Sequence, residues 1–103
     1  MKRTIAALAS ITLLAGAARP AVAADPQQGG VLAKRWCASC HVVAADQARG
    51  STQAPPFSEI ANKKGLTAAL IALFLLRPHP PMPDMNLSRN EASDLAAYIE
   101  SQK

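Results

Sequence analysis

Two cysteines and a histidine stand together in the segment WCASCH, residues 36–41. Cys37 and Cys40 are three positions apart, and His41 directly follows the second cysteine. Side chains three residues apart in a helical turn lie on the same side of the backbone. The segment therefore places two thiols and an imidazole close together, where they can form a disulfide, bind a metal or hold a cofactor.

Four kinds of site use such a pattern. A redox dithiol of the thioredoxin type belongs beside a strand, and no strand pattern precedes Trp36. Zinc prefers four ligands, whereas this segment offers three, and the neighbouring Cys40 and His41 side chains point in different directions on a helix. A structural disulfide would leave the histidine without a role. Covalent haem attachment uses all three side chains.

We therefore expect one haem c, held through two thioether bonds from Cys37 and Cys40. In this arrangement the sulfurs add to the two vinyl groups of the porphyrin, whose separation matches one helical turn. His41 would then place its imidazole under the centre of the ring, on the iron.

The first 24 residues have the layout of a secretory signal peptide. A short basic head is followed by the apolar stretch TIAALASITLLAGAA and by small residues that allow cleavage after Ala23 or Ala24. The apolar stretch is short for a bilayer span, which needs about 20 such residues. We predict a cleaved signal peptide over 1–24, a single domain over 25–103, a periplasmic location and no stable membrane insertion.

Removal of the leader nearly neutralises the chain. The whole sequence has 11 Lys and Arg, 7 Asp and Glu and a formal charge of +4. Lys2, Arg3 and Arg19 lie in the leader, which leaves eight basic and seven acidic residues. A nucleic-acid partner needs a clustered basic surface, so we expect no nucleic-acid binding.

The remaining domain reads as all-α, because three segments have helical patterns and none alternates as a strand does. The predicted helices cover residues 26–38, 67–76 and 89–101. Their N-terminal caps are Asp25 with Pro26 behind it, Thr67, and Ser88 with Glu91 in a capping box. The second helix is apolar all round, which predicts that it is enclosed on most sides. A domain of this size usually needs a staple, and a haem would supply one.

A proline-rich strap, RPHPPMPDMN over residues 77–86, precedes the last helix. Prolines and methionines dominate Pro80–Met85, so we predict an extended segment. Met82 is the best candidate for a second iron ligand, because Pro81 and Pro83 restrict the backbone on both sides of it.

Two other strap residues remain alternatives for this ligand. Met85 is expected to fill the core instead, as flexible methionine side chains often do. His79 would give an iron with two imidazole ligands, and we expect it to be exposed to solvent. The apolar surroundings of the iron are expected to come from the second helix and from Trp36, Phe57, Leu66 and Tyr98.

The domain resembles the class I cytochromes c over essentially all of residues 25–103. The motifs that carry the resemblance are Gly29 eight residues before Cys37, then CASCH, APPF, the Met82-Pro83 pair and the terminal SRNEASDLAAYI. The resemblance implies the class I cytochrome c fold, with three main helices and loops wrapped around one covalently attached haem.

The resemblance also implies roles for individual residues. Gly29 would pack against Tyr98 where the first and last helices meet. The carbonyl of Pro55 would accept a hydrogen bond from His41, and Met82 would complete the iron coordination with His41.

These features together predict a soluble, exported monohaem c-type cytochrome that carries single electrons between respiratory or dehydrogenase partners. It would not be an enzyme, because histidine and methionine fill the iron coordination and a thioether ligand raises the reduction potential. The alternatives are a haem enzyme or gas sensor in which Met82 is displaced, a dedicated haem subunit of a dehydrogenase, and a thiol oxidoreductase. Bases that could steer an acidic partner are Lys34, Arg35, Lys63, Lys64 and Arg77.

Overall fold

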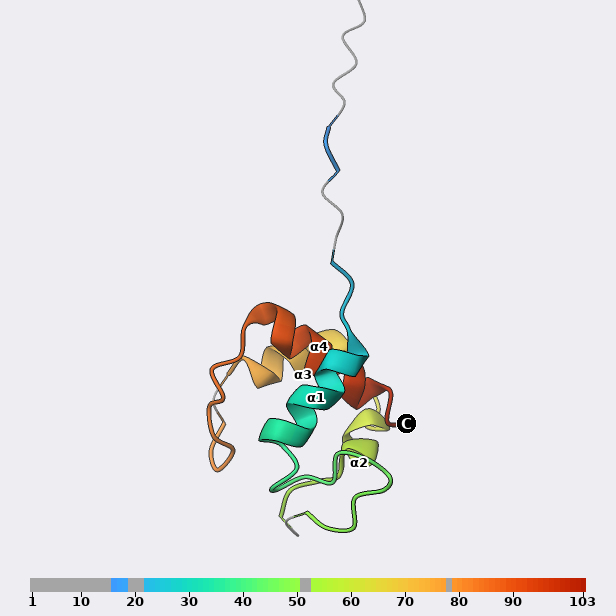
Figure 1. Ribbon diagram of the computed structural model, residues 1–103, viewed down its shortest axis with the longest axis vertical. Helices are drawn as coiled ribbons and strands as arrows, with labels where there is room; N and C mark the ends of the chain where they lie inside the picture. The colour runs from blue at the N-terminus through green and yellow to red at the C-terminus, as the bar shows by residue number, and fades with distance from the viewer. Residues whose placement is uncertain (1–15, 19–21, 51–52, 78) are drawn as a thin grey trace, which may run out of the picture.

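The computed structural model describes residues 16–18, 22–50, 53–77 and 79–103 (Figure 1). Most of the predicted leader lies outside these residues, so its cleavage stays a prediction. The helices of the described residues are α1 (Pro26–Trp36), α2 (Phe57–Ala61), α3 (Ala68–Leu75) and α4 (Arg89–Glu100). The described part of the chain has no strand beyond an isolated bridge between His79 and Met82. The all-α prediction is confirmed.

The helices begin where the sequence places their caps. Asp25 accepts hydrogen bonds from the backbone of the first turn of α1, and Thr67 accepts one from Leu70 at the start of α3. Ser88 and Glu91 form the reciprocal capping box of α4. These caps satisfy backbone N–H groups that have no partner within the helix.

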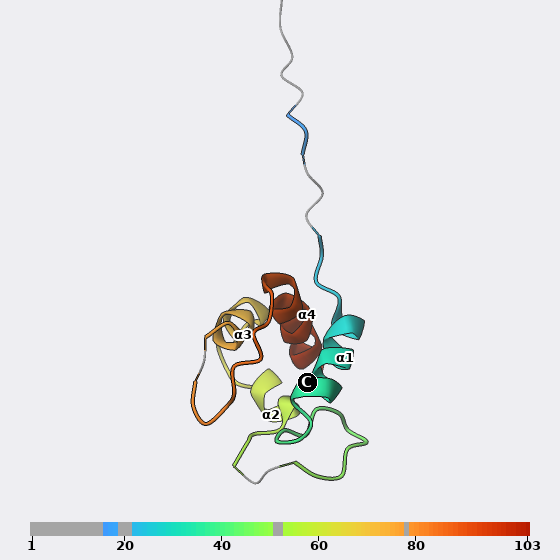
Figure 2. The same ribbon diagram turned by 60° about the vertical axis from the view of Figure 1, so that its left-hand side comes forward.

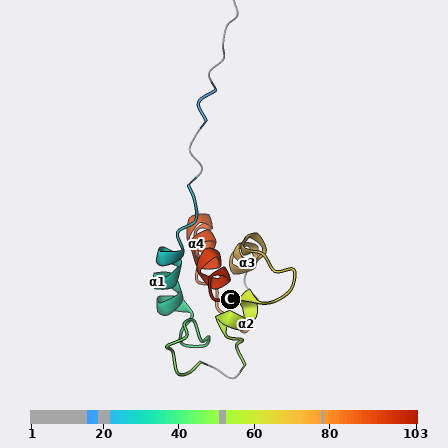
Figure 3. The same ribbon diagram turned by 90° about the vertical axis from the view of Figure 1, so that its right-hand side faces the viewer.

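Helix α4 is the centre of the fold, because α1, α2 and α3 all pack against it. Figures 2 and 3 show α4 between α1 and α3, with α2 below. The buried face of α4 repeats at helical spacing and consists of Ala92, Leu95, Ala96 and Ile99. Burial of this stripe holds the three other helices around a common element.

Two glycines allow α1 to approach α4 closely. A Cβ atom on Gly29 would lie against the backbone of Asp94 and 2.8 Å from Cβ of Tyr98. A Cβ atom on Gly30 would lie 3.1 Å from the ring of Tyr98. The expected packing of Gly29 against Tyr98 is confirmed, and Gly30 extends it by lying beneath the ring.

Three expectations about the helices need correction. Helix α1 ends at Trp36 rather than at residue 38, because Cys37 caps it and begins a turn. Helix α2 was not predicted, since its five residues are too few to show a helical period. Helix α3 is not enclosed: Ile71 is its buried residue, and Leu70, Leu73 and Phe74 are largely exposed.

The strap is not extended throughout. Between His79 and Met82 the chain makes a tight turn, in which the Met82 N–H donates to the His79 carbonyl at 3.0 Å and the Pro80–Pro81 peptide is cis. Residues 83–88 then run without regular structure to the cap of α4. None of the helices in the described ranges is both long enough and apolar enough to cross a bilayer.

Candidate functional site

The two cysteines and the histidine lie in a tight turn that follows α1. The N–H of Cys40 donates to the Cys37 carbonyl at 3.1 Å, and the N–H of His41 donates to the same carbonyl at 2.8 Å. Cys37 is buried, Cys40 is exposed, and the two thiols are not joined in a disulfide. The turn therefore presents two separate thiols and an imidazole within five residues.

The Cys37 thiol does not have the properties of a redox-active cysteine. Burial, and to a lesser extent the neighbouring Cys40, raise the pKa of the Cys37 thiol to about 11. Redox-active cysteines have lowered pKa values and are at least partly exposed. A zinc site is not supported either, since the described residues contain no cluster of three or more His, Cys, Asp or Glu side chains arranged to hold a metal ion.

The imidazole of His41 is oriented by the loop that precedes α2. Its Nδ1 atom lies 2.6 Å from the carbonyl oxygen of Pro55. Because a carbonyl oxygen can only accept, Nδ1 must carry the proton, and the lone pair is on Nε2. The predicted His41–Pro55 contact is confirmed. It leaves His41 in the tautomer that can bind a metal through Nε2.

An aromatic series connects His41 to α4. The Phe57 ring lies 5.4 Å from the His41 ring and 6.3 Å from the Tyr98 ring, in both cases between centroids. Phe57 is buried, while Leu66 and Tyr98 are half-buried against the core. Trp36, which was expected in the same apolar surroundings, is 43% exposed and lies beneath the guanidinium of Arg35 at 4.9 Å, so its place beside the haem stays a prediction.

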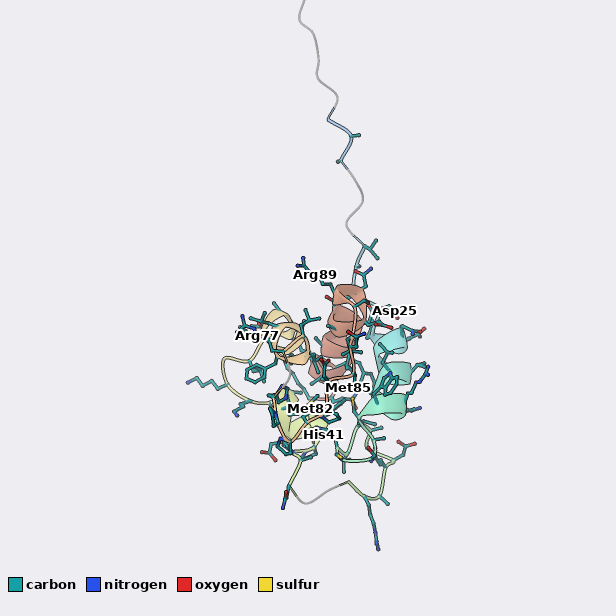
Figure 4. The ribbon with its side chains drawn as sticks, turned by 90° about the vertical axis from the view of Figure 1, so that its left-hand side faces the viewer. Asp25, His41, Arg77, Met82, Met85 and Arg89 are labelled. Carbon is teal, nitrogen blue, oxygen red and sulfur yellow. The ribbon has the colours of Figure 1, made fainter. Side chains whose placement is uncertain are left out.

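The strap carries the two candidate methionine ligands. Met82 and Met85 are both half-buried. In the view of Figure 4 they project close to His41, whereas Arg77 and Arg89 lie toward the periphery. Both thioethers therefore come from the segment in which the sequence predicts the second iron ligand.

His79 is not the solvent-exposed residue that we expected. It is half-buried, its Nδ1 lies 2.9 Å from the Arg77 carbonyl, and its ring meets the edge of Phe74 with centroids 5.5 Å apart. These two contacts fix His79 against the end of α3. They give it a structural role in closing the strap.

Sequence reasoning missed one polar residue of this region. The side chain of Gln47 is hydrogen-bonded to the backbone on both sides of His41. No motif marks Gln47, and a lone glutamine in a loop has no typical partner. Its contacts become apparent only when the loop is folded.

The predicted basic residues are all exposed, but they come from three different segments. Lys34 and Arg35 lie on α1, Lys63 and Lys64 follow α2, and Arg77 follows α3. None of these five bases takes part in the ion pair found among the described residues, which joins Lys103 to Glu100 at 3.7 Å, at the C-terminal end of the chain.

The donor atoms of the site fit a covalently bound haem. Two unpaired thiols could form thioethers, an imidazole with its lone pair on Nε2 could bind iron, and the strap carries two methionines that could supply a further ligand. An all-helical fold with such a turn after its first helix is what the resemblance to the class I cytochromes c implies. The family model described as cytochrome c matches residues 26–103.

The chain belongs to the cytochrome c family, and specifically to its class I monohaem members, with covalently attached haem c as cofactor. It is similar to cytochrome c-552 of Bradyrhizobium diazoefficiens. The two are 50% identical over 91 residues, which cover 88% of each chain. No solved structure matches the chain.

Proposed function

We propose that this electron-carrying cytochrome is exported and transfers single electrons between a respiratory or dehydrogenase donor and a terminal acceptor, with His41 and Met82 as its iron ligands. The family and the name of the relative support an electron carrier. The observation that carries the proposal is the 2.6 Å contact between His41 Nδ1 and the Pro55 carbonyl. It gives the imidazole one orientation and one tautomer, with the lone pair on Nε2.

Three residues of the turn would hold the haem. Cys37 and Cys40 would form its thioether bonds, and His41 would bind the iron through Nε2. The haem supplies one-electron chemistry when bound. The hydrogen bond from His41 to Pro55 makes the imidazole a stronger donor and keeps its ring from rotating.

Met82 is the residue that would serve as the second iron ligand. Its backbone N–H is held by the turn to His79 at 3.0 Å, and Pro81 and Pro83 flank it, so its backbone has little freedom. Met85 lies beyond the turn, next to the Asp84–Asn86 contact at 2.8 Å. His79 is already engaged with Arg77 and Phe74. Of the three candidate ligands on the strap, Met82 therefore has the backbone that its neighbours restrict most.

This ligand set favours a protein that carries electrons and does not make or break bonds in a substrate. Two strong protein ligands leave no open position for oxygen or a substrate, and a thioether stabilises reduced iron. Removal of residues 1–24 during export would match the pattern of a basic head, an apolar stretch and small residues before Asp25.

Two measurements on protein from a host that matures c-type cytochromes test the proposal. Intact mass should show one haem and no thiol that can be alkylated, with a chain that starts after Ala23 or Ala24. The oxidised protein should show the weak long-wavelength band of a sulfur–iron bond, and the reduced protein should not bind carbon monoxide at neutral pH. Rapid carbon monoxide binding would favour the enzyme or sensor alternative, and a chain without haem would end the proposal.

A further inference from the structure

Gln47 joins both ends of the segment that contains His41. Its Oε1 atom accepts a hydrogen bond from the N–H of Val43 at 2.9 Å. Its Nε2 atom lies 3.0 Å from the Ala38 carbonyl, 2.8 Å from the His41 carbonyl and 2.7 Å from the Arg49 carbonyl. One half-buried side chain therefore contacts the backbone before, at and after the histidine.

The chemistry of these partners requires an amide. Three carbonyl oxygens face Nε2 and can only accept, while the Val43 N–H facing Oε1 can only donate. A carboxylate at this position would place a negative charge against three carbonyl oxygens. An apolar side chain would leave all four backbone groups without this partner, and each unpaired group that is shielded from water is costly.

Gly50 shows how tightly this loop returns to the histidine. A Cβ atom on Gly50 would lie 2.8 Å from the Cys40 carbonyl oxygen and 2.9 Å from the backbone carbon of His41. The chain after Gln47 therefore packs directly on the peptide of His41. The Gln47 amide lies inside this closed loop.

We propose that Gln47 is a positioning residue for haem ligation, which holds the His41 backbone so that the imidazole meets the Pro55 carbonyl. The inference rests on the proposed role of His41 as iron ligand. His41 is held at two points: its carbonyl by Gln47 at 2.8 Å and its ring by Pro55 at 2.6 Å. Loss of the first contact lets the residue shift along the loop, which weakens the second.

Weakening of the His41–Pro55 hydrogen bond has an electronic consequence. The imidazole becomes a poorer donor when its Nδ1 proton is less strongly bound by an acceptor. A poorer donor stabilises ferric iron less, so the reduction potential rises. A residue that only stapled the loop would change the unfolding free energy without this effect.

The test compares Gln47→Met and Gln47→Glu with the same changes at Gln28. Gln28 lies exposed in the first turn of α1 and gives a matched control for each substitution. The holoproteins are studied by redox titration and by proton NMR of the His41 Nδ1–H. Gln47→Met should have a higher potential than wild type, and its Nδ1–H should exchange faster by on the order of tenfold, the factor for loss of one net hydrogen bond.

Gln47→Glu provides a second, isosteric test. It keeps the acceptor for the Val43 N–H and loses the donor for the three carbonyls, so faster Nδ1–H exchange is expected here too. The free energy of unfolding is measured for the same variants. If both variants are less stable than wild type but keep its Nδ1–H exchange rate and reduction potential, Gln47 only stabilises the loop, and the inference is overturned. Failure of the proposed function is distinct, because it would appear in the wild-type spectrum.

Discussion

The phenol oxygen of Tyr98 donates a hydrogen bond to the carbonyl oxygen of Val43 at 2.7 Å, across 55 residues of sequence. Tyr98 lies on α4, and Val43 lies two residues after His41. The same ring covers Gly30 of α1 and meets Phe57 of α2. One side chain of the central helix therefore connects the α1 crossing, the start of α2 and the loop of the proposed iron ligand.

Replacement of Tyr98 by phenylalanine should lower the free energy of unfolding by about 1 kcal/mol, because the Val43 carbonyl loses its partner while the ring stays in place. Denaturant unfolding of the two holoproteins measures the difference. An unchanged midpoint and slope would show that the hydrogen bond does not stabilise the fold.

The stability difference between wild type and Tyr98→Phe should depend on pH. Burial, and then the charge of Asp46, raise the pKa of Tyr98. Only the protonated phenol can donate to Val43, so this contribution is complete below the ordinary tyrosine pKa of about 10 and is lost as the pH rises through the higher folded value. Unfolding curves from pH 7 upward should show a constant gap that closes only in the alkaline range. A gap that closes near pH 8 would contradict this assignment.

The two glycines of α1 should respond differently to alanine. In Gly29→Ala the new methyl group meets the Asp94 backbone, which cannot move away cheaply, so we expect a net loss of about 1–3 kcal/mol. In Gly30→Ala it meets the Tyr98 ring at 3.1 Å, and the gain in helix propensity, about 1 kcal/mol, offsets the crowding. Thermal unfolding of both variants measures the contrast. Equal losses would mean that the helices do not cross at Gly29.

Substitution of the strap methionines distinguishes the two candidate ligands. Met82→Ala should lower the reduction potential, remove the long-wavelength band and let carbon monoxide bind, since the thioether that favours reduced iron is lost. Met85→Ala should leave the spectrum nearly unchanged. Its loss in free energy of unfolding should not exceed about 2–5 kcal/mol, the range for a fully buried methionine. The opposite pattern would make Met85 the ligand.

Electron-transfer rates should fall as ionic strength rises if the exposed bases steer an acidic partner, because salt screens charges beyond about 10 Å. The bases concerned are Lys34, Arg35, Lys63, Lys64 and Arg77. Stopped-flow rates with an acidic redox protein, compared for wild type and for Lys63→Gln with Lys64→Gln, measure the effect. Electron-transfer rates that do not change with ionic strength would show that these bases do not steer the partner.

Local sequence signals were sufficient for the start of each long helix. The caps at Asp25, Thr67 and Ser88 act on backbone groups two or three residues away, so their effect does not depend on the rest of the chain. The turn at Cys37–His41 is equally local. The cofactor could be predicted from the same local signals, because the CxxCH spacing is typical of covalent haem attachment.

Burial and long-range contacts needed the folded chain. Helix α3 is uniformly apolar, so no period shows that Ile71 is buried while Leu70, Leu73 and Phe74 are exposed. Gln47 binds carbonyls up to nine residues away, and His79 is held by Phe74, which precedes it on another element. A pattern of residue types cannot specify such contacts when each partner is common in loops.

What the sequence determined by itself is therefore the helical class, the haem turn and the strap that carries the candidate methionine ligands. Only the tertiary structure decided that His41 meets Pro55, that Tyr98 reaches Val43 and that Gln47 closes the loop between them. The physical reason is the separation in sequence between the interacting residues. Caps and turns depend on neighbours within about four residues, whereas these hydrogen bonds join residues that lie 6, 14 and 55 positions apart in the sequence.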